Sequence, residues 1–169
     1  MKQLSIIVTL LLSSYASAWD FSGAVGSTGE GQTTLRIGAT DAWQSEWFVS
    51  DSGRLTGYWD VGLTFWDKGN FNKTRYSISA SPVLVYEFTG NSTYKPFIEA
   101  GIGLALFSGT KVGDQDMGSA LHFEDRIGAG VRINNRHVLG IRAIHYSNAG
   151  FKKPNQGIES YHLYYRYQF

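Results

Sequence analysis

Cysteine is absent from the 169-residue sequence, which excludes disulfide bonds and a thiolate nucleophile. Charged residues make up only 17% of the chain, and 15 basic residues, Lys2 among them, nearly balance 14 acidic ones. This near equality of positive and negative charge argues against a surface that binds nucleic acid through its charge. Beyond the first twenty residues, no stretch approaches the roughly 18 apolar residues that a membrane-spanning helix needs.

The opening of the chain has the layout of a secretory signal peptide. Lys2 precedes a short apolar run over residues 4–12, and residues 16–18 form an Ala-Ser-Ala cleavage site. The apolar run is too short to cross a bilayer as a helix. We therefore predict that residues 1–18 are removed on export and that residues 19–169 form one domain.

Aromatic residues make up 15% of the chain, and the mature part contains all 20 glycines. Apolar and polar side chains alternate along it in segments separated by turn residues, a pattern typical of β-strands. Eight such strands are predicted, over residues 20–28, 32–42, 53–67, 73–89, 94–107, 119–133, 137–148 and 158–169.

Each predicted strand has one apolar face and one face that carries charges of both signs. In the sixth strand, Phe123, Ile127 and Val131 alternate with Glu124 and Arg126. A barrel of eight strands has a lumen wide enough only for side chains, and charges buried there must be paired. The economical arrangement places the apolar faces in lipid and the charges inside. The charged residues expected inside are Asp60, Glu87, Glu99, Glu124, Arg126, Arg132, Arg142 and Arg166.

The last strand alternates aromatic with polar residues and ends at Phe169, as strands of outer-membrane barrels do. The predicted fold is therefore all-β, an eight-stranded antiparallel transmembrane β-barrel of the outer membrane. A soluble secreted barrel or sandwich is the alternative. Residues 41–53 form the one long connection at the periplasmic end, where the spacing of Trp43, Trp47 and Phe48 suits one or two helical turns at the membrane interface.

His145 and Ser147 lie two residues apart in the seventh strand and therefore share a face. They continue the apolar, outward set of Ile141 and Ala143, and Glu159 points outward on the next strand. An imidazole, a hydroxyl and a carboxylate on a lipid-facing wall are costly as structure alone. We interpret them as the base, nucleophile and orienting acid of an ester hydrolase. The simpler interpretation is a polar band that touches lipid headgroups.

Several neighbours complete the predicted site. Asn148 and a backbone N–H near Gly150 are candidate donors to an oxyanion. Phe123 and Asp125, on the sixth strand, face outward near the same level. The four histidines have no metal-ligand spacing, so we predict no metal site.

Taken together, these segments resemble the lipid A 3-O-deacylase (PagL) family of Gram-negative outer membranes. The resemblance covers most of the mature chain in register. Its most specific segments are RLTGYWD at 54–60, PFIEAGIG at 96–103, FEDRIGAG at 123–130, AIHYSNAG at 143–150 and PNQGIESY at 154–161.

The resemblance implies hydrolysis of the ester-linked 3-hydroxyacyl chain at position 3 of lipid A, in the outer leaflet and without a cofactor. It implies catalytic roles for His145, Ser147 and Glu159, and places Phe123, Asp125 and Asn148 in the active-site region. The implied partners are lipopolysaccharide and outer-membrane lipids, and a homodimer stays open. A phospholipase or acyltransferase, or a barrel without enzymatic activity, are the alternatives.

Overall fold

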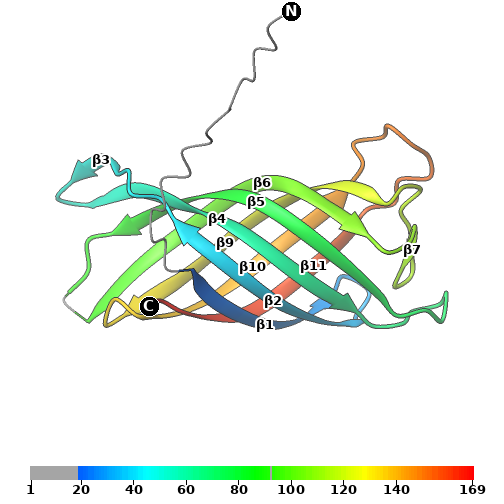
Figure 1. The fold of residues 1–169 in the computed structure, drawn as a ribbon, viewed down its shortest axis with the longest axis horizontal. Helices are drawn as coiled ribbons and strands as arrows, with labels where there is room; N and C mark the ends of the chain where they lie inside the picture. Colours follow the sequence, from blue (N-terminus) through cyan, green and yellow to red (C-terminus); the bar gives the residue numbers. More distant parts are fainter. Residues whose placement is uncertain (1–18, 92) are drawn as a thin grey trace, which may run out of the picture.

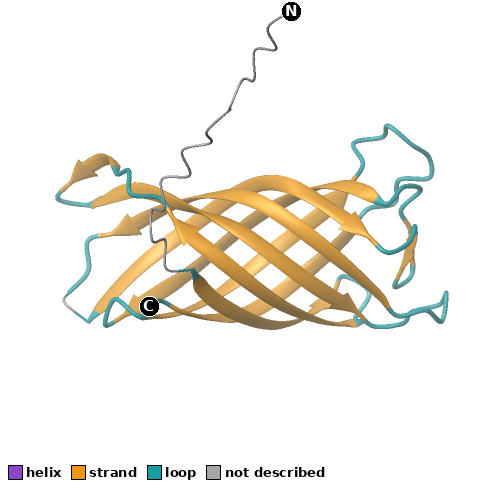
Figure 2. Cartoon of the chain, in the orientation of Figure 1, coloured by secondary structure: helices purple, strands orange, loops and turns teal. Residues whose placement is uncertain are grey.

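The structure is a computed structural model, and it describes residues 19–91 and 93–169. The predicted signal peptide lies outside the described residues. Figure 2 shows strands and loops over the described part of the chain, without helices. The same residues contain no helix long and apolar enough to cross a membrane. The strands are β1 Asp20–Thr28, β2 Thr33–Ala42, β3 Trp47–Ser50, β4 Gly53–Trp66, β5 Arg75–Phe88, β6 Tyr94–Phe107, β7 Lys111–Val112, β8 Gln115–Asp116, β9 Leu121–Ile133, β10 His137–Ser147 and β11 Ile158–Tyr167.

Eight of the strands in the described residues form a closed antiparallel barrel (Figure 1). Each long strand pairs with its neighbours in the chain, β1 pairs with β11, and β2 pairs with β4. Closure gives the backbone N–H and C=O groups of each of these strands partners on both sides, which a structure that crosses hydrocarbon requires. The eight predicted strands are confirmed to within a few residues at each end.

Side chains alternate strictly between the wall and the lumen. In β9, Ile127 points outward with 67% of its surface exposed, whereas its neighbour Arg126 is buried at 2%. The wall is an almost continuous apolar surface, which would be unfavourable in water and suits lipid. Polar and charged residues fill the lumen, as predicted. Its buried members include Arg36, Asp60, Glu87, Glu99, Glu124, Arg126, Arg142, His162 and Arg166.

Charged side chains inside the barrel form two clusters, and opposite charges are paired within each of them. In the first, the Nη2 of Arg126 donates to Asp60 at 2.8 Å and also pairs with Glu124. Arg36 donates to the same oxygen of Asp60 at 2.5 Å. In the second cluster, Glu99 accepts from Arg142 at 3.0 Å. Because each carboxylate meets at least one guanidinium, the charges are paired where water cannot reach them.

Apolar side chains fill the lumen at the loop end of the barrel, the end that carries β7 in Figure 1. Met117, from the loop between β6 and β9, is fully buried there. The rings of Trp66, Phe107 and Tyr146 lie with their centroids 5.3–5.4 Å apart. Ring pairs at such spacings are favourable. This cluster, which also contains Ala105, Val112, Ile144 and Ile158, closes the lumen at this end.

The prediction of helical turns within residues 41–53 is wrong. The segment forms a loop followed by β3, which folds back on β4. β4 extends past the end of β2, whose last pair is Ala42 with Tyr58. The start of β4 therefore has an edge free of β2, and β3 pairs with part of that edge. An i, i+4 spacing of aromatic residues fits one face of a strand as well as one face of a helix, and Trp43 and Trp47 contact each other edge-on across 6.1 Å.

The charged clusters lead to a stability prediction. Replacing Arg126 with Met leaves Asp60 and Glu124 short of a partner in the lumen, which should lower the free energy of unfolding by about 3–5 kcal/mol. Urea unfolding of the purified barrel in detergent measures the loss. Lys152→Met, at an exposed loop position, is the control and should leave the midpoint unchanged. Equal midpoints for the two variants would contradict the role of the cluster.

Candidate active site

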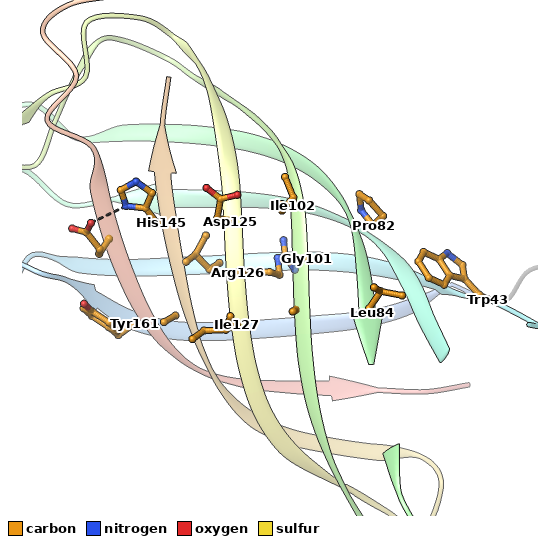
Figure 3. A pocket seen from close by; sticks show the side chains of 14 residues that line it. Trp43, Pro82, Leu84, Gly101, Ile102, Asp125, Arg126, Ile127, His145 and Tyr161 are labelled. Atoms are coloured by element: carbon orange, nitrogen blue, oxygen red, sulfur yellow. Dashed lines mark hydrogen bonds and ion pairs between the residues drawn. The ribbon is translucent and has the colours of Figure 1, made fainter. Parts of the chain in front are cut away.

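The site is built on two neighbouring strands at the loop end of the barrel. His145 on β10 lies directly opposite Glu159 on β11 in the antiparallel register. Both side chains point outward and are 43% exposed, and His145 Nδ1 lies 2.8 Å from Glu159 Oε1 (Figure 3). A carboxylate that accepts the Nδ1 proton fixes the tautomer of the ring and leaves Nε2 with its lone pair. The imidazole is thus oriented to accept a proton.

Ser147 lies on the same outward face of β10, two residues beyond His145. Two residues of strand correspond to about 7 Å of backbone. The described residues contain no hydrogen bond between the side chains of Ser147 and His145. Such contacts are often long in the absence of substrate and tighten in the complex. The structure therefore joins His145 to Glu159 and places Ser147 on their face.

Two glycines lie beside the imidazole and the carboxylate. Gly157 precedes β11 with a positive φ of 70°, and a Cβ there would come within 3.0 Å of the His145 ring. Gly29 donates its backbone N–H to the carbonyl oxygen of Glu159. The sequence analysis assigned no role to either residue. Gly157 directly precedes a predicted strand, and glycine is the usual residue where a turn there takes a positive φ.

Phe123 and Asp125 flank the site from β9, as the sequence predicts. Asp125 lies opposite His145 in the register, on the side away from Glu159, and Phe123 lies opposite Ser147. Figure 3 shows the carboxylate of Asp125 beside the imidazole. Phe123 also contacts Phe151 of the β10–β11 loop, with ring centroids 6.4 Å apart. His145 thus has a carboxylate on each neighbouring strand.

Asn148, which the sequence analysis offers as an oxyanion donor, directly follows Ser147 in the loop after β10. One residue beyond Ser147, its side chain turns inward, and only 4% of the residue is exposed. Its amide donates to the carbonyl oxygens of Met117 and Lys152 at 3.1 and 2.9 Å, and its Oδ1 accepts the N–H of Gly150 at 3.0 Å. In this structure the side-chain amide of Asn148 and the N–H of Gly150 thus form hydrogen bonds within the loops. Asn148 fixes the backbone that follows Ser147.

An apolar groove of about 840 Å³ runs from this site along the outer wall. It begins at His145, Glu159 and Asp125 and crosses β9, β6 and β5 to reach Trp43 near the opposite end of the barrel (Figure 3). We call it groove 1. Small residues on its path leave room between larger neighbours. Its other lining residues are Pro82, Leu84, Ala100, Gly101, Ile102, Arg126, Ile127, Ala143, Ile144 and Tyr161. The groove has the shape and polarity to hold a hydrocarbon chain.

Within the described residues, no cluster of three or more His, Asp or Glu side chains could hold a metal ion.

The chain as a whole was compared with known proteins, and the matches agree with one another. The sequence model of "Lipid A 3-O-deacylase (PagL)" matches residues 30–168. The lipid A deacylase PagL of Pseudomonas aeruginosa is 54% identical over 169 residues, which cover 98% of this chain and 97% of that protein. PagL of Bordetella bronchiseptica is 35% identical over 82% of this chain and 76% of that protein. A crystal structure of the outer membrane enzyme PagL superposes with a TM-score of 0.87 and 56% identity, covering 89% of this chain and 99% of that one.

The outward position of the site can be tested with spin labels, since the chain has no native cysteine. A label on Cys at position 147 in a reconstituted bilayer should relax readily with oxygen, which concentrates in hydrocarbon. A label at position 146 should be shielded from oxygen and from a water-soluble nickel complex, because Tyr146 is fully buried in the lumen. A strong oxygen response at 146 and none at 147 would invert the assignment of the two faces.

Proposed function

The chain belongs to the lipid A 3-O-deacylase (PagL) family, and from this premise we propose how its own residues cleave the ester. Ser147 is the nucleophile, His145 the general base, and Glu159 the acid that orients and stabilises the imidazolium. The observation that carries the proposal is the 2.8 Å hydrogen bond between His145 Nδ1 and Glu159 on the outward face that also bears Ser147. Base and orienting acid held in this way are two of the three parts of a hydrolytic triad.

The reaction proceeds in two halves. His145 Nε2 takes the proton of Ser147 as its Oγ attacks the carbonyl carbon of the 3-O-linked acyl chain. The tetrahedral intermediate collapses, the bond to the sugar oxygen breaks, and His145 returns the proton to that oxygen. His145 then deprotonates a water molecule, which attacks the acyl-serine ester. Collapse of the second intermediate releases the 3-hydroxy fatty acid and restores Ser147.

The position of the residues on the outer wall determines how the substrate arrives. Ser147, His145 and Glu159 point away from the lumen, and groove 1 runs from His145 and Glu159 along the apolar wall. We therefore propose that lipid A enters sideways from the outer leaflet, with the scissile acyl chain in groove 1. The loops beside the site lie at the end of the barrel opposite the C-terminus (Figure 1), which is the extracellular end in a barrel whose termini lie in the periplasm.

Family membership makes lipid A the substrate, and the same leaflet also contains phospholipid in small amounts. A phospholipase or acyltransferase would use the same nucleophile and base. The deacylase assay therefore also contains phospholipid. A phospholipase would hydrolyse it, and an acyltransferase would use it as the acyl donor. Release of free hydroxy fatty acid from lipid A alone supports the deacylase over either alternative.

The triad predicts a graded loss of activity. Ser147→Ala and His145→Ala should each lower kcat by at least about 10³-fold, because nucleophile and base act as a unit. Glu159→Gln should lower kcat by a smaller factor, about one to two orders of magnitude below the parent, since the orienting acid contributes less than its partners. Mass spectrometry of lipid A after incubation with each purified variant measures the loss.

Folding must be checked in each variant. The heat-dependent mobility shift of the barrel on gels is the readout, and the variants should match the parent because all three residues lie on the outer wall. Ser147→Ala activity above about one percent of the parent in a folded barrel would point to another nucleophile.

A further inference from the structure

A second apolar groove lies on the same wall of the barrel and joins groove 1. It has a volume of about 610 Å³ and runs over β9, β10 and β11. We call it groove 2. Ile127, Ala143 and Tyr161 line both grooves. The remaining residues of groove 2 are Gly128, Ala129, Ile141, Arg142, His162 and Leu163.

The shared residues place the junction one strand repeat below the reacting groups. Ala143 lies two residues before His145 on β10, and Tyr161 lies two residues after Glu159 on β11. In the antiparallel register, Ala143 is opposite Ile127 on one side and Tyr161 on the other. The methyl group of Ala143 is smaller than the side chains of Ile127 and Tyr161, which leaves open the space where the two grooves meet. The junction is therefore about 7 Å of strand from the ester site.

The two grooves differ in what they reach. Groove 1 is lined by His145 and Glu159 themselves, whereas groove 2 reaches neither. A chain in groove 2 is consequently held next to the site without being cleaved. A third hollow of the wall, over β1, β2, β4 and the edge of β5, has no residue in common with the site. A hollow on the outer wall is therefore not by itself evidence of a binding site. Groove 2 is distinguished by its junction with groove 1.

We propose that groove 2 binds a second acyl chain of the same lipid A molecule, the amide-linked chain on the sugar carbon next to the cleaved ester. This inference rests on the proposed function and adds a specificity determinant to it. Two chains on neighbouring ring carbons leave the sugar a few ångströms apart and run in the same direction into the leaflet. A forked groove whose branches separate about one strand repeat below the ester matches that arrangement.

The retained chain contributes by positioning the substrate. Both chains are already in hydrocarbon before binding, so little apolar surface leaves water and the hydrophobic effect contributes little. The gain comes from contacts with Ala129, Ile141 and Leu163 that fix the rotation of the sugar, and with it the ester carbonyl beside Ser147. A substrate with one chain would reach the nucleophile in more orientations, most of them unproductive.

The test compares two synthetic substrates in detergent micelles. Both are glucosamine 1-phosphates with the same 3-O-linked 3-hydroxyacyl chain, and they carry either an N-acetyl group or a long N-linked acyl chain. In the unaltered enzyme, kcat/KM for the two-chain compound should exceed that for the one-chain compound on the order of tenfold. We call this quotient the chain ratio.

Three variants assign the ratio to a groove. Ala129→Trp fills groove 2 from its exposed floor and should bring the chain ratio close to one. Ala100→Trp fills groove 1 alone and should lower kcat/KM for both substrates while the ratio stays high. Ala80→Trp, at an exposed wall position on β5 that lines neither groove, is the matched control and should change neither quantity.

Two results would overturn the inference: a chain ratio near one in the unaltered enzyme, or a ratio unchanged by Ala129→Trp in a folded barrel. If the tryptophan variant does not fold, the chain ratio of the unaltered enzyme against N-linked chains of increasing length still decides. The ratio should rise and then level off when the groove is filled, and a flat series contradicts the proposal. Ser147→Ala tests the proposed function separately, because its activity decides the nucleophile whatever the chain ratio is.

Discussion

The closed ladder of backbone hydrogen bonds is the constraint on which the rest of this structure depends. In hydrocarbon, an unpaired N–H or C=O costs several kcal/mol, so the strands must pair all the way round, β1 with β11 included. Once the ladder is closed, the two-residue repeat assigns every side chain to the wall or the lumen. The charges of the lumen must then satisfy one another, and Asp60 does so with both Arg36 and Arg126.

The same ladder makes the geometry of the proposed catalytic site rigid. Enzymes commonly hold their reacting groups in a cleft between packed elements. Here the imidazole and the carboxylate are cross-strand neighbours, and the register of β10 with β11 sets their separation. Ser147 is the last residue of β10, and the loop after it is fastened by Asn148, whose amide bonds carbonyl groups of two different loops. Rigid backbone on both sides of Ser147, the proposed nucleophile, limits the motion that would otherwise misalign its side chain.

The strands and the shared outward face of His145, Ser147 and Glu159 could be predicted from the sequence because both follow from the alternation of polar and apolar residues over many positions. The prediction that failed, helical turns in residues 41–53, concerns a segment where a strand ends. The segment around Trp43 and Trp47 satisfies two periods at once, and pairing with the free edge of β4 decided between them. The contacts of the Asn148 side chain could not be predicted from its place next to Ser147. Its partners are Met117 and Lys152, and a contact with a residue 31 positions away leaves no local trace in the sequence.

The apolar cluster that fills the loop end of the lumen has a consequence for the kinetics of this enzyme. With Met117, Trp66 and Phe107 closing the barrel there, molecules do not pass through it, and the proposed site faces the membrane. Encounters between enzyme and substrate are then governed by diffusion within a plane. The quantity that sets the rate is the fraction of leaflet area occupied by substrate, in place of a concentration in solution. The shortened lipid remains in that plane as a diluent, so turnover slows as the leaflet is converted even when the enzyme itself is unchanged.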